Sequence, residues 1–274
     1  MRKRIKRLIQ MKKKSIILLS ILFSLFIYEK TFSKVYFVGE IVSNKFEVSK
    51  KFNVKLPEGE WEVIAKYATS EYGLGLKGMI LARAENNHVA EFFLITEFLL
   101  GGIYQSALNE AVYEITFKDK YDGCYERPEY YKLGLYKKGS AHNCLVIGHS
   151  ETKKDIYFPE DPESTFAQTK KWLRQTNYKI PPIMLGSSHS YFSRITGGNL
   201  YTLGYLIDPL LLGAPESEFK TEETSEYHKY NIEKHLEHKK IMDEFVKISF
   251  QRHQEFEKII KARGFQRLKF EDLK

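Results

Sequence analysis

The chain has 274 residues and a formal net charge of +8. This charge belongs to one end of the chain, because residues 1–33 hold nine Lys or Arg and one Glu, whereas residues 34–274 hold 34 basic and 34 acidic residues. Nucleic-acid binding needs a basic surface that displaces condensed counterions, and residues 34–274 have no net charge that would indicate one. We therefore expect no nucleic-acid partner.

Residues 1–33 have the layout of an export signal. A basic head is followed by the uncharged run 15–28, and Thr31 and Ser33 offer small residues at the spacing that a signal peptidase reads. Fourteen helical residues cover roughly 21 Å, less than the roughly 30 Å hydrocarbon core of a bilayer. We predict a cleaved signal peptide, with a retained N-terminal membrane anchor as the alternative. The signal could equally begin at Met11, so the true start, Met1 or Met11, stays open.

The two cysteines, Cys124 and Cys144, lie after this segment. In an exported protein an even cysteine count favours a disulfide, and closing a loop of about 20 residues stabilises by roughly 3 kcal/mol. A metal site formed with His142 and His149 is the alternative, but the spacing lacks the close ligand pairs typical of zinc sites. Two buried free thiols are the expectation if the chain is not exported. We predict a Cys124–Cys144 disulfide and no metal or other cofactor.

Strand patterns occupy most of the chain up to Phe158. Runs rich in β-branched and aromatic residues cover 36–42, 60–68, 75–84 and 88–97. A turn is predicted at Leu56–Gly59 and a tight hairpin at Asn86–Asn87. These signals predict an antiparallel meander.

Helix signals follow in two places. Pro162 and nearby acidic residues favour a helix near 163–177, which must end before Pro181. Residues 183–208 return to a strand pattern and predict a second hairpin around Thr196–Asn199. An apolar stripe over about 226–263 predicts a long C-terminal helix.

Together these elements predict an α+β fold, with an antiparallel sheet and the long C-terminal helix packed against it. Residues 34–274 are enough for a single α+β domain. The polar, acidic stretch 214–225 is the best candidate for a hinge before the C-terminal helix.

Motifs that suggest chemistry are weak. Gly73–Gly78 matches G-x-G-x-x-G, but a strand pattern follows where a dinucleotide site needs a helix, so we interpret it as a loop. The stretches Gly148–Ser150 and Gly186–Ser190, which contain His149 and His189, put serine beside histidine outside the G-x-S-x-G context of a nucleophile. His228, His235 and His238 would share one face of the C-terminal helix without the i, i+4 spacing of metal ligands, so we interpret them as solvated residues. We name no catalytic residue.

Aromatic residues give the strongest binding signal. Four tyrosines and one arginine crowd a short segment, and such side chains combine flat apolar faces with polar tips. This aromatic patch consists of Tyr121, Tyr125, Arg127, Tyr130 and Tyr131. It predicts contact with an envelope protein, a peptide or a glycan.

Several short strings resemble a group of uncharacterised exported proteobacterial proteins. They are Leu56–Trp61, the cysteine after Gly123, His142–Cys144, the Trp172 helix leading to Pro181–Pro182, Tyr205–Pro209 and Gly264–Phe265. The chain departs from that group at Asp208, where an asparagine is expected, and at Leu145, where an aromatic residue is expected. The resemblance implies an exported α+β protein and supplies no activity.

The sequence therefore favours an exported, non-enzymatic binding or assembly protein of the periplasm. We expect it to be soluble or tethered to the inner membrane, with membrane contact through the N-terminal segment if that segment is uncleaved. The alternative is a periplasmic hydrolase that uses serine and histidine, or a metal, in a cleft of the sheet.

Overall fold

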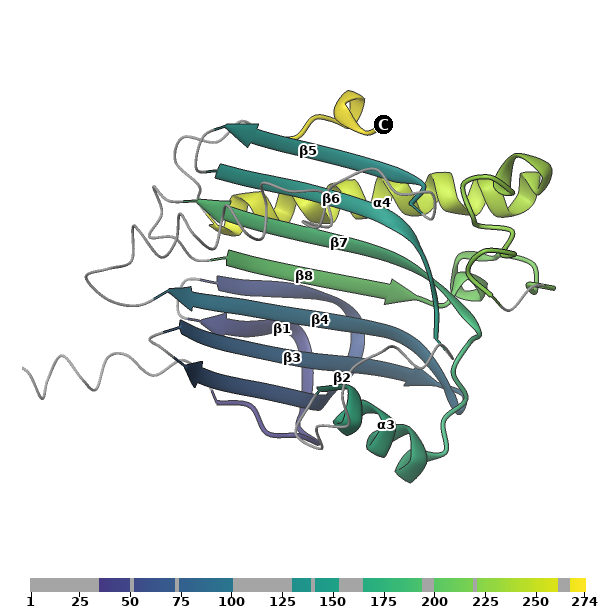
Figure 1. The fold of residues 1–274 in the computed structure, drawn as a ribbon. Helices are drawn as coiled ribbons and strands as arrows, with labels where there is room; N and C mark the ends of the chain where they lie inside the picture. The colour runs from purple at the N-terminus through teal and green to yellow at the C-terminus, as the bar shows by residue number, and fades with distance from the viewer. Residues whose placement is uncertain are drawn as a thin grey trace, which may run out of the picture.

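The computed structural model describes residues 35–49, 52–71, 74–100, 130–138, 141–152, 165–193, 200–218, 221–260 and 267–274. In these residues eight strands form one antiparallel sheet with the order β1-β2-β3-β4-β8-β7-β6-β5 (Figure 1). The strands are β1 (Ile41–Ser49), β2 (Phe52–Glu71), β3 (Leu74–Glu85), β4 (His88–Leu100), β5 (Lys132–Lys138), β6 (Ala141–Glu151), β7 (Ile183–Ser193) and β8 (Leu200–Ile207).

Two meanders of four strands meet at the centre of the sheet. Strands β1 to β4 follow one another in sequence and in space, as do β5 to β8, and the halves join where β4 pairs with β8. Phe93 faces Tyr205 at this junction. The predicted meander is confirmed, and β7 pairs with β8 as the second hairpin requires, although its turn at Thr196–Asn199 lies outside the described residues. The fold is mostly sheet and broadly α+β.

One face of the sheet is covered by the long helix α4 (Leu236–Ile260). In Figure 1 this helix runs across β6 and β7. Its buried side chains Met242, Phe245 and Phe256 join the main core with inward residues of both meanders. Tyr205 stacks on Phe245 at 6.2 Å, and Trp61 from β2 meets Phe93 edge-on at 5.4 Å. The prediction of a long C-terminal helix packed against the sheet is confirmed.

The opposite face carries the short helix α3 (Thr165–Thr176) near β2 and β3 (Figure 1). Trp172 is the buried anchor of this helix, because it packs with Ile64, Ala65 and Met184 in a second core. Its indole N–H also donates to the Glu62 carboxylate at 3.0 Å. The predicted helix near 163–177 is therefore present, with its described part beginning at Thr165.

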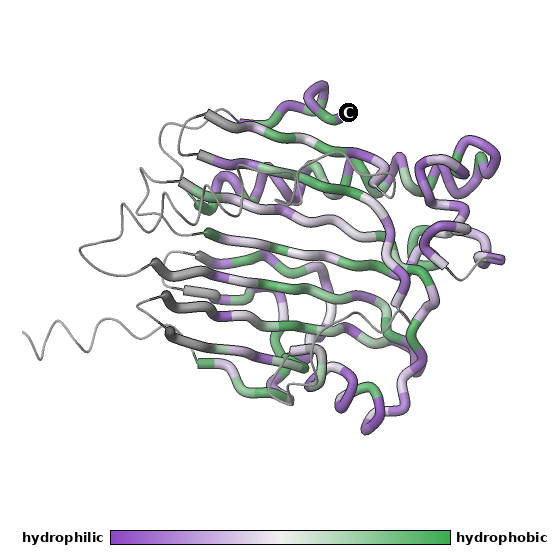
Figure 2. Tube along the Cα trace, viewed as in Figure 1, coloured by the Kyte–Doolittle hydropathy of each residue, from purple (hydrophilic) through white to green (hydrophobic). Residues whose placement is uncertain are grey.

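Both faces of the sheet carry hydrophobic side chains. Figure 2 shows hydrophobic stretches along the central strands. Successive residues of these strands belong to different hydrophobic clusters. Thus Leu145 and Leu185 face α4, whereas Val146 and Met184 lie on the α3 side. We call the face of the sheet that carries α3 the α3 side and the face covered by α4 the α4 side. Within the described ranges, no helix has the length and apolar character needed to cross a bilayer.

Several predicted boundaries were wrong. The first strand begins at Ile41 rather than Tyr36, and Leu56–Gly59 lies inside β2 instead of reversing the chain. Gly59 still has a positive φ of 126°, as a glycine in a bend allows. Residues 74–78 of the glycine motif belong to β3 and pair with both β2 and β4, so they are not a loop. Cross-strand pairing outweighs local glycine content at these positions.

The C-terminal helix begins ten residues later than predicted. Residues before Leu236 form turns and the short 3-10 helix η3 (Ile232–Lys234), so His228 and His235 lie outside α4. A second 3-10 helix, η2 (Pro209–Leu212), follows β8, and a third, η4 (Phe270–Asp272), lies near the C-terminus. The Asn86–Asn87 hairpin is confirmed, because both residues have the positive φ values, 50° and 64°, that such a turn requires.

Candidate functional site

A cavity of about 760 Å³ lies between α3 and the sheet. Its floor is built by side chains on the α3 side of four strands, and most of them are hydrophobic. The apolar residues are Ile80, Phe92, Leu94, Val146 and Leu206, with Leu173 contributed by α3. Ligand pockets in proteins occupy roughly 300–1,000 Å³ and are mostly apolar, so this cavity has the size and lining of a binding site.

Three glycines leave part of the cavity floor without side chains. Gly148, Gly186 and Gly204 lie on three successive strands and line the cavity. Gly148 pairs directly with Gly186, and Gly204 pairs with Ser188. A Cβ on Gly186 would come within 2.9 Å of Leu206, and one on Gly204 within 3.2 Å of Leu94. Glycine at these positions therefore leaves room for a ligand and allows the neighbouring leucines to pack flat.

Charged residues lie on two sides of the cavity. Lys170 and Arg174 are one helical turn apart on α3, and both are exposed. Glu151 and Glu222 lie on the other side, where the Glu222 N–H donates to the Glu151 carboxylate at 3.2 Å. The cavity thus combines an apolar floor with a basic edge on α3 and a separate acidic edge.

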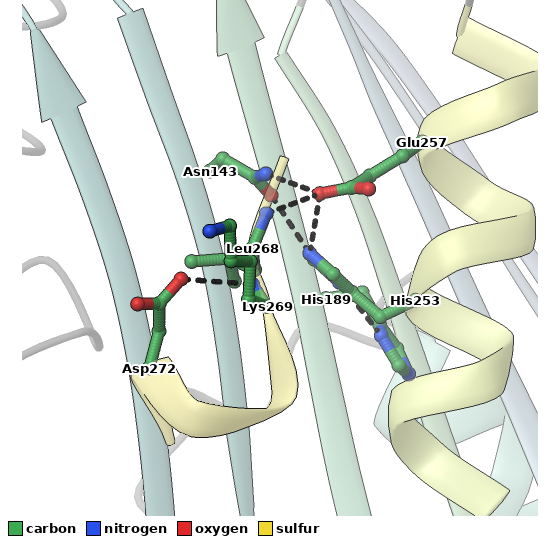
Figure 3. A network of polar contacts seen from close by, with 7 residues as sticks. All are labelled: Asn143, His189, His253, Glu257, Leu268, Lys269 and Asp272. Atoms are coloured by element: carbon green, nitrogen blue, oxygen red, sulfur yellow. Dashed lines mark hydrogen bonds and ion pairs between the residues drawn. The ribbon is translucent and has the colours of Figure 1, made fainter. Parts of the chain in front are cut away.

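A chain of buried polar groups lies on the α4 side of the same strands (Figure 3). Ser187 Oγ is 3.1 Å from His189 Nε2, and His189 Nδ1 is 3.1 Å from His253 Nδ1. His253 Nε2 is 2.8 Å from Asn143 Oδ1, and Asn143 Nδ2 donates to Glu257 Oε1 at 2.6 Å. All five residues are buried. This Ser187–Glu257 chain joins β6 and β7 to α4.

The hydrogen-bond geometry of the Ser187–Glu257 chain fits neutral imidazole rings on both His189 and His253. Each group can donate to the next in one direction: Ser187 to His189, His189 to His253, His253 to Asn143, and Asn143 to Glu257. Burial lowers the pKa of His253 to about 3, and burial together with the charges of His253 and Arg252 lowers the pKa of His189. Burial raises the pKa of Glu257, although the Asn143 amide and the Leu268 N–H both donate to its carboxylate.

A second buried polar group lies under α4 nearer the centre of the sheet. The Tyr205 hydroxyl and the Arg83 guanidinium both donate to the Glu91 carboxylate, which is only 2% exposed. The Arg252 guanidinium lies 3.6 Å from the centre of the Tyr205 ring. The ion pair of Arg83 and Glu91 joins β3 to β4, and the contact between Arg252 and the Tyr205 ring connects this group to α4.

The structure brings serine and histidine together in one of the two predicted stretches and not in the other. Ser187 and His189 do meet, with their side chains on the α4 side, and Ser187 also lines the cavity. His149 and Ser150 are successive strand residues and point to opposite faces. The His149 ring contacts the Glu222 carbonyl at 2.8 Å instead.

The residues of the alternative metal site also lie on different faces of the sheet. His142 and Cys144 lie on the α3 side, and His149 lies on the α4 side. Residues that the structure describes contain no group of three or more His, Cys, Asp or Glu side chains that could hold a metal ion. His228, His235 and His238 also do not share a helix face, because only His238 belongs to α4. The interpretation of these histidines as solvated was wrong for His228 and His238, since both are buried.

Cys144 is buried on β6, and its predicted partner Cys124 lies outside the described residues. The disulfide therefore stays a prediction.

The aromatic patch is described only in part. Tyr130 lines the cavity, whereas the Tyr131 hydroxyl donates to Asp243 on α4 at 2.5 Å, so the two point to opposite faces. Tyr121, Tyr125 and Arg127 lie outside the described residues. A joint binding role for the five residues stays a prediction.

Sequence reasoning missed the cavity because its lining comes from strands that lie far apart in the chain. Glycines inside strands were the available signal, since such glycines often mark close approach of another group. The i, i+4 pair of His253 and Glu257 on the predicted terminal helix was the available signal for the buried chain.

Comparisons with protein-family models, curated proteins and solved structures found no match to this chain.

Proposed function

We propose that this protein is an exported envelope protein that binds an amphiphilic molecule in the cavity between α3 and the sheet, without catalysing a reaction. The observation that carries the proposal is the cavity itself, with its volume of about 760 Å³ and its apolar floor. Burial of apolar ligand surface supplies most of the binding energy in such a site. This favours a lipid-like ligand over the glycan or peptide considered from the sequence.

The charged edges support one orientation of the ligand. Lys170 and Arg174 place two cationic side chains beside the apolar floor, whereas the carboxylates of Glu151 and Glu222 lie on another side. An anionic headgroup is therefore favoured next to α3, with the acyl chain lying over Gly186 and Gly204. A single-chain anionic lipid is the ligand class that this arrangement fits best.

The hydrolase alternative receives less support from the geometry. The Ser187 hydroxyl contacts His189 at 3.1 Å, but Ser187 is 4% exposed and points toward α4. Ser187 is among the residues that line the cavity, but a serine nucleophile must turn its hydroxyl toward the substrate carbonyl, and this hydroxyl faces His189 on the α4 side. Its contacts instead fit a role in holding α4.

The proposed location is the periplasm, with the protein either soluble or tethered to the inner membrane. Support comes from the basic head and uncharged run in residues 1–28. A lipid-binding cavity is useful where apolar molecules must cross an aqueous compartment. The proposed Cys124–Cys144 disulfide belongs to the same compartment.

Ser188→Trp tests the cavity. Ser188 is an exposed strand residue that lines the cavity, so an indole there would fill space that a ligand needs without disturbing a buried contact. We expect the natural chain to bind a fluorescent polyene fatty acid and the variant to bind it at least about tenfold more weakly, which is about 1.4 kcal/mol. The measurement is a fluorescence titration.

Ser43→Trp is the matched control, since Ser43 is also an exposed strand serine but lies outside the cavity. It should bind the fatty acid like the natural chain. Equal affinity of the two tryptophan variants, or no binding by the natural chain, would contradict the proposal.

A further inference from the structure

Four hydrophobic side chains are exposed within seven residues at the start of the described chain. They are Val35, Phe37, Val38 and Ile41, with exposed fractions of 60%, 64%, 51% and 54%. We call these four residues the N-terminal patch. Single exposed hydrophobic residues are common, but a cluster of this kind marks a contact surface.

The patch is held in a fixed position on the protein. Tyr36, between Val35 and Phe37, is buried and stacks on Phe46 with ring centres 4.2 Å apart. The Glu47 N–H donates to the Tyr36 hydroxyl at 2.8 Å. Two backbone bonds, from Gly39 N–H to the Val63 carbonyl and from Val63 N–H to the Glu40 carbonyl, attach the segment to β2. Because Tyr36 points inward, its neighbours must point outward.

The position of the patch in the chain indicates what covers it. The uncharged run ends at Tyr28, so Val35 lies at most about 25 Å from that end even in a fully extended chain. A run of 14 residues is shorter than the bilayer core, and such a mismatch draws the flanking residues toward the membrane surface. A tethered chain would therefore hold the patch against the bilayer.

Lys66 adds a charge suited to that surface. Its ammonium lies 5.3 Å from the centre of the Phe37 ring and 3.4 Å from the Tyr36 carbonyl. Lysine beside aromatic and aliphatic side chains is typical of membrane interfaces, where the alkyl stem lies in the apolar layer and the ammonium meets lipid phosphates.

We propose that the N-terminal patch rests in the interface of a phospholipid bilayer, and this inference relies on the tethered form of the proposed function. The same strand connects the patch to the cavity. Lys66 exchanges backbone hydrogen bonds with the Gln168 side chain on α3, at 3.0 and 2.7 Å, while its own side chain contacts the patch. A patch at the membrane would thus place α3, which walls the cavity, close to the source of a lipid ligand.

Phe37→Trp in the full chain tests the contact. The protein is reconstituted into vesicles of phosphatidylethanolamine and phosphatidylglycerol, some of whose acyl chains carry bromine, a contact quencher of tryptophan. The signal of the natural chain, from the buried Trp61 and Trp172, is subtracted. Tyr230→Trp is the matched control, since Tyr230 is 65% exposed and also has a lysine, Lys229, over its ring.

We expect brominated lipid to quench the indole at position 37 at least twofold more than the indole at position 230. Equal quenching at the two positions would overturn the inference, as would a full chain that fails to float with vesicles. An indole at position 37 that is shielded from aqueous iodide but untouched by brominated lipid would mean that a protein covers the patch, which also overturns it. Fatty-acid titration without vesicles tests the cavity separately, so failure of one proposal does not imply failure of the other.

Discussion

At the scale of single residues, the shape of the cavity depends on glycine positions as much as on the hydrophobic side chains that line it. Gly148, Gly186 and Gly204 remove three side chains from adjacent strands, and the leucines around them form a flat apolar floor. Among the described residues that line the cavity, the cations are Lys170 and Arg174, and both belong to α3. The selectivity of the cavity for charge should therefore respond to single substitutions on α3.

Arg174→Glu should weaken binding of a fatty acid by roughly threefold to tenfold, because it replaces an attractive charge beside the headgroup with a repulsive one. Binding of the corresponding fatty alcohol should change little. Lys171→Glu is the control, since Lys171 is an exposed lysine of the same helix that does not line the cavity. Titrations of both ligands at low salt check this, and an equal loss for acid and alcohol would argue against recognition of charge.

At the scale of elements, α4 is held by polar contacts as well as by its apolar stripe. Asn143 on β6 accepts from His253 and donates to Glu257, and these residues are one turn apart on α4. A single amide thus satisfies two buried groups of the helix. Glu237 in the first turn and Lys258 in the last also have the charges that favour the helix dipole.

Asn143→Ala should lower the free energy of unfolding by roughly 2–4 kcal/mol, because it removes the acceptor of the buried His253 N–H and one of the two N–H donors to the buried Glu257 carboxylate. Urea denaturation followed by circular dichroism measures this. Asn53→Ala serves as the control: Asn53 is half-buried on β2 and its side-chain oxygen has no hydrogen-bond partner, so the loss there should stay below about 1 kcal/mol. A loss of similar size in both variants would mean that the amide does not hold the helix.

At the scale of the whole molecule, the two faces of the sheet have different tasks. The α4 side contains the larger core and both buried polar groups, so it provides stability. The α3 side has a smaller core and the cavity, so it can accommodate a ligand. Conditions that affect the buried histidines should therefore change stability before they change the cavity itself.

Stability should fall as the pH drops below about 6.5. The folded pKa of His253 is about 3, so between these values the unfolded chain binds more protons than the folded chain. At about pH 5 this single residue costs roughly 2 kcal/mol relative to neutral pH, and the lowered pKa of His189 acts in the same direction. Glu257 opposes the trend, because a raised folded pKa gives stability that is present at low pH and lost as the pH rises.

Urea midpoints measured between about pH 5 and pH 7.5 check this dependence. His253→Gln should flatten it, whereas His88→Gln, at an exposed histidine, should leave it unchanged. A natural chain whose midpoint stays constant over this range would show that the buried imidazoles do not control its stability.

Export should determine whether the two cysteines are oxidised to a disulfide or stay as free thiols. Protein recovered from the periplasm and denatured without reductant should resist alkylation at Cys124 and Cys144. After reduction, both cysteines should be alkylated. Mass spectrometry counts the labelled thiols. The same chain kept in the cytoplasm by deletion of residues 15–28 should be alkylated at both positions, because thiols stay reduced there. Two free thiols in the exported protein would refute the bridge.

The sequence by itself determined the antiparallel meander, the Asn86–Asn87 hairpin, α3 near Trp172 and the long terminal helix. These features depend on neighbours in the chain: alternation, turn residues and an apolar stripe act over a few residues. The limits of β2 and α4 were predicted less well. Residues 56–59 of β2 lie in a register shift between its pairs with Ser43 and Lys45 of β1, and α4 begins at Leu236, after the 3-10 helix η3.

Only the tertiary structure decided which side chains meet. Both serines line the cavity, but strand alternation directs their side chains to opposite faces, so the Ser187 hydroxyl joins the buried chain beneath α4 and the Ser188 side chain does not. The cavity itself requires β3, β4, β6, β7, β8 and α3 to come together, and the order of strands in the sheet is fixed by long-range pairing such as that of β4 with β8. Local pattern carries no record of that pairing, since its energy comes from contacts between residues more than 100 positions apart.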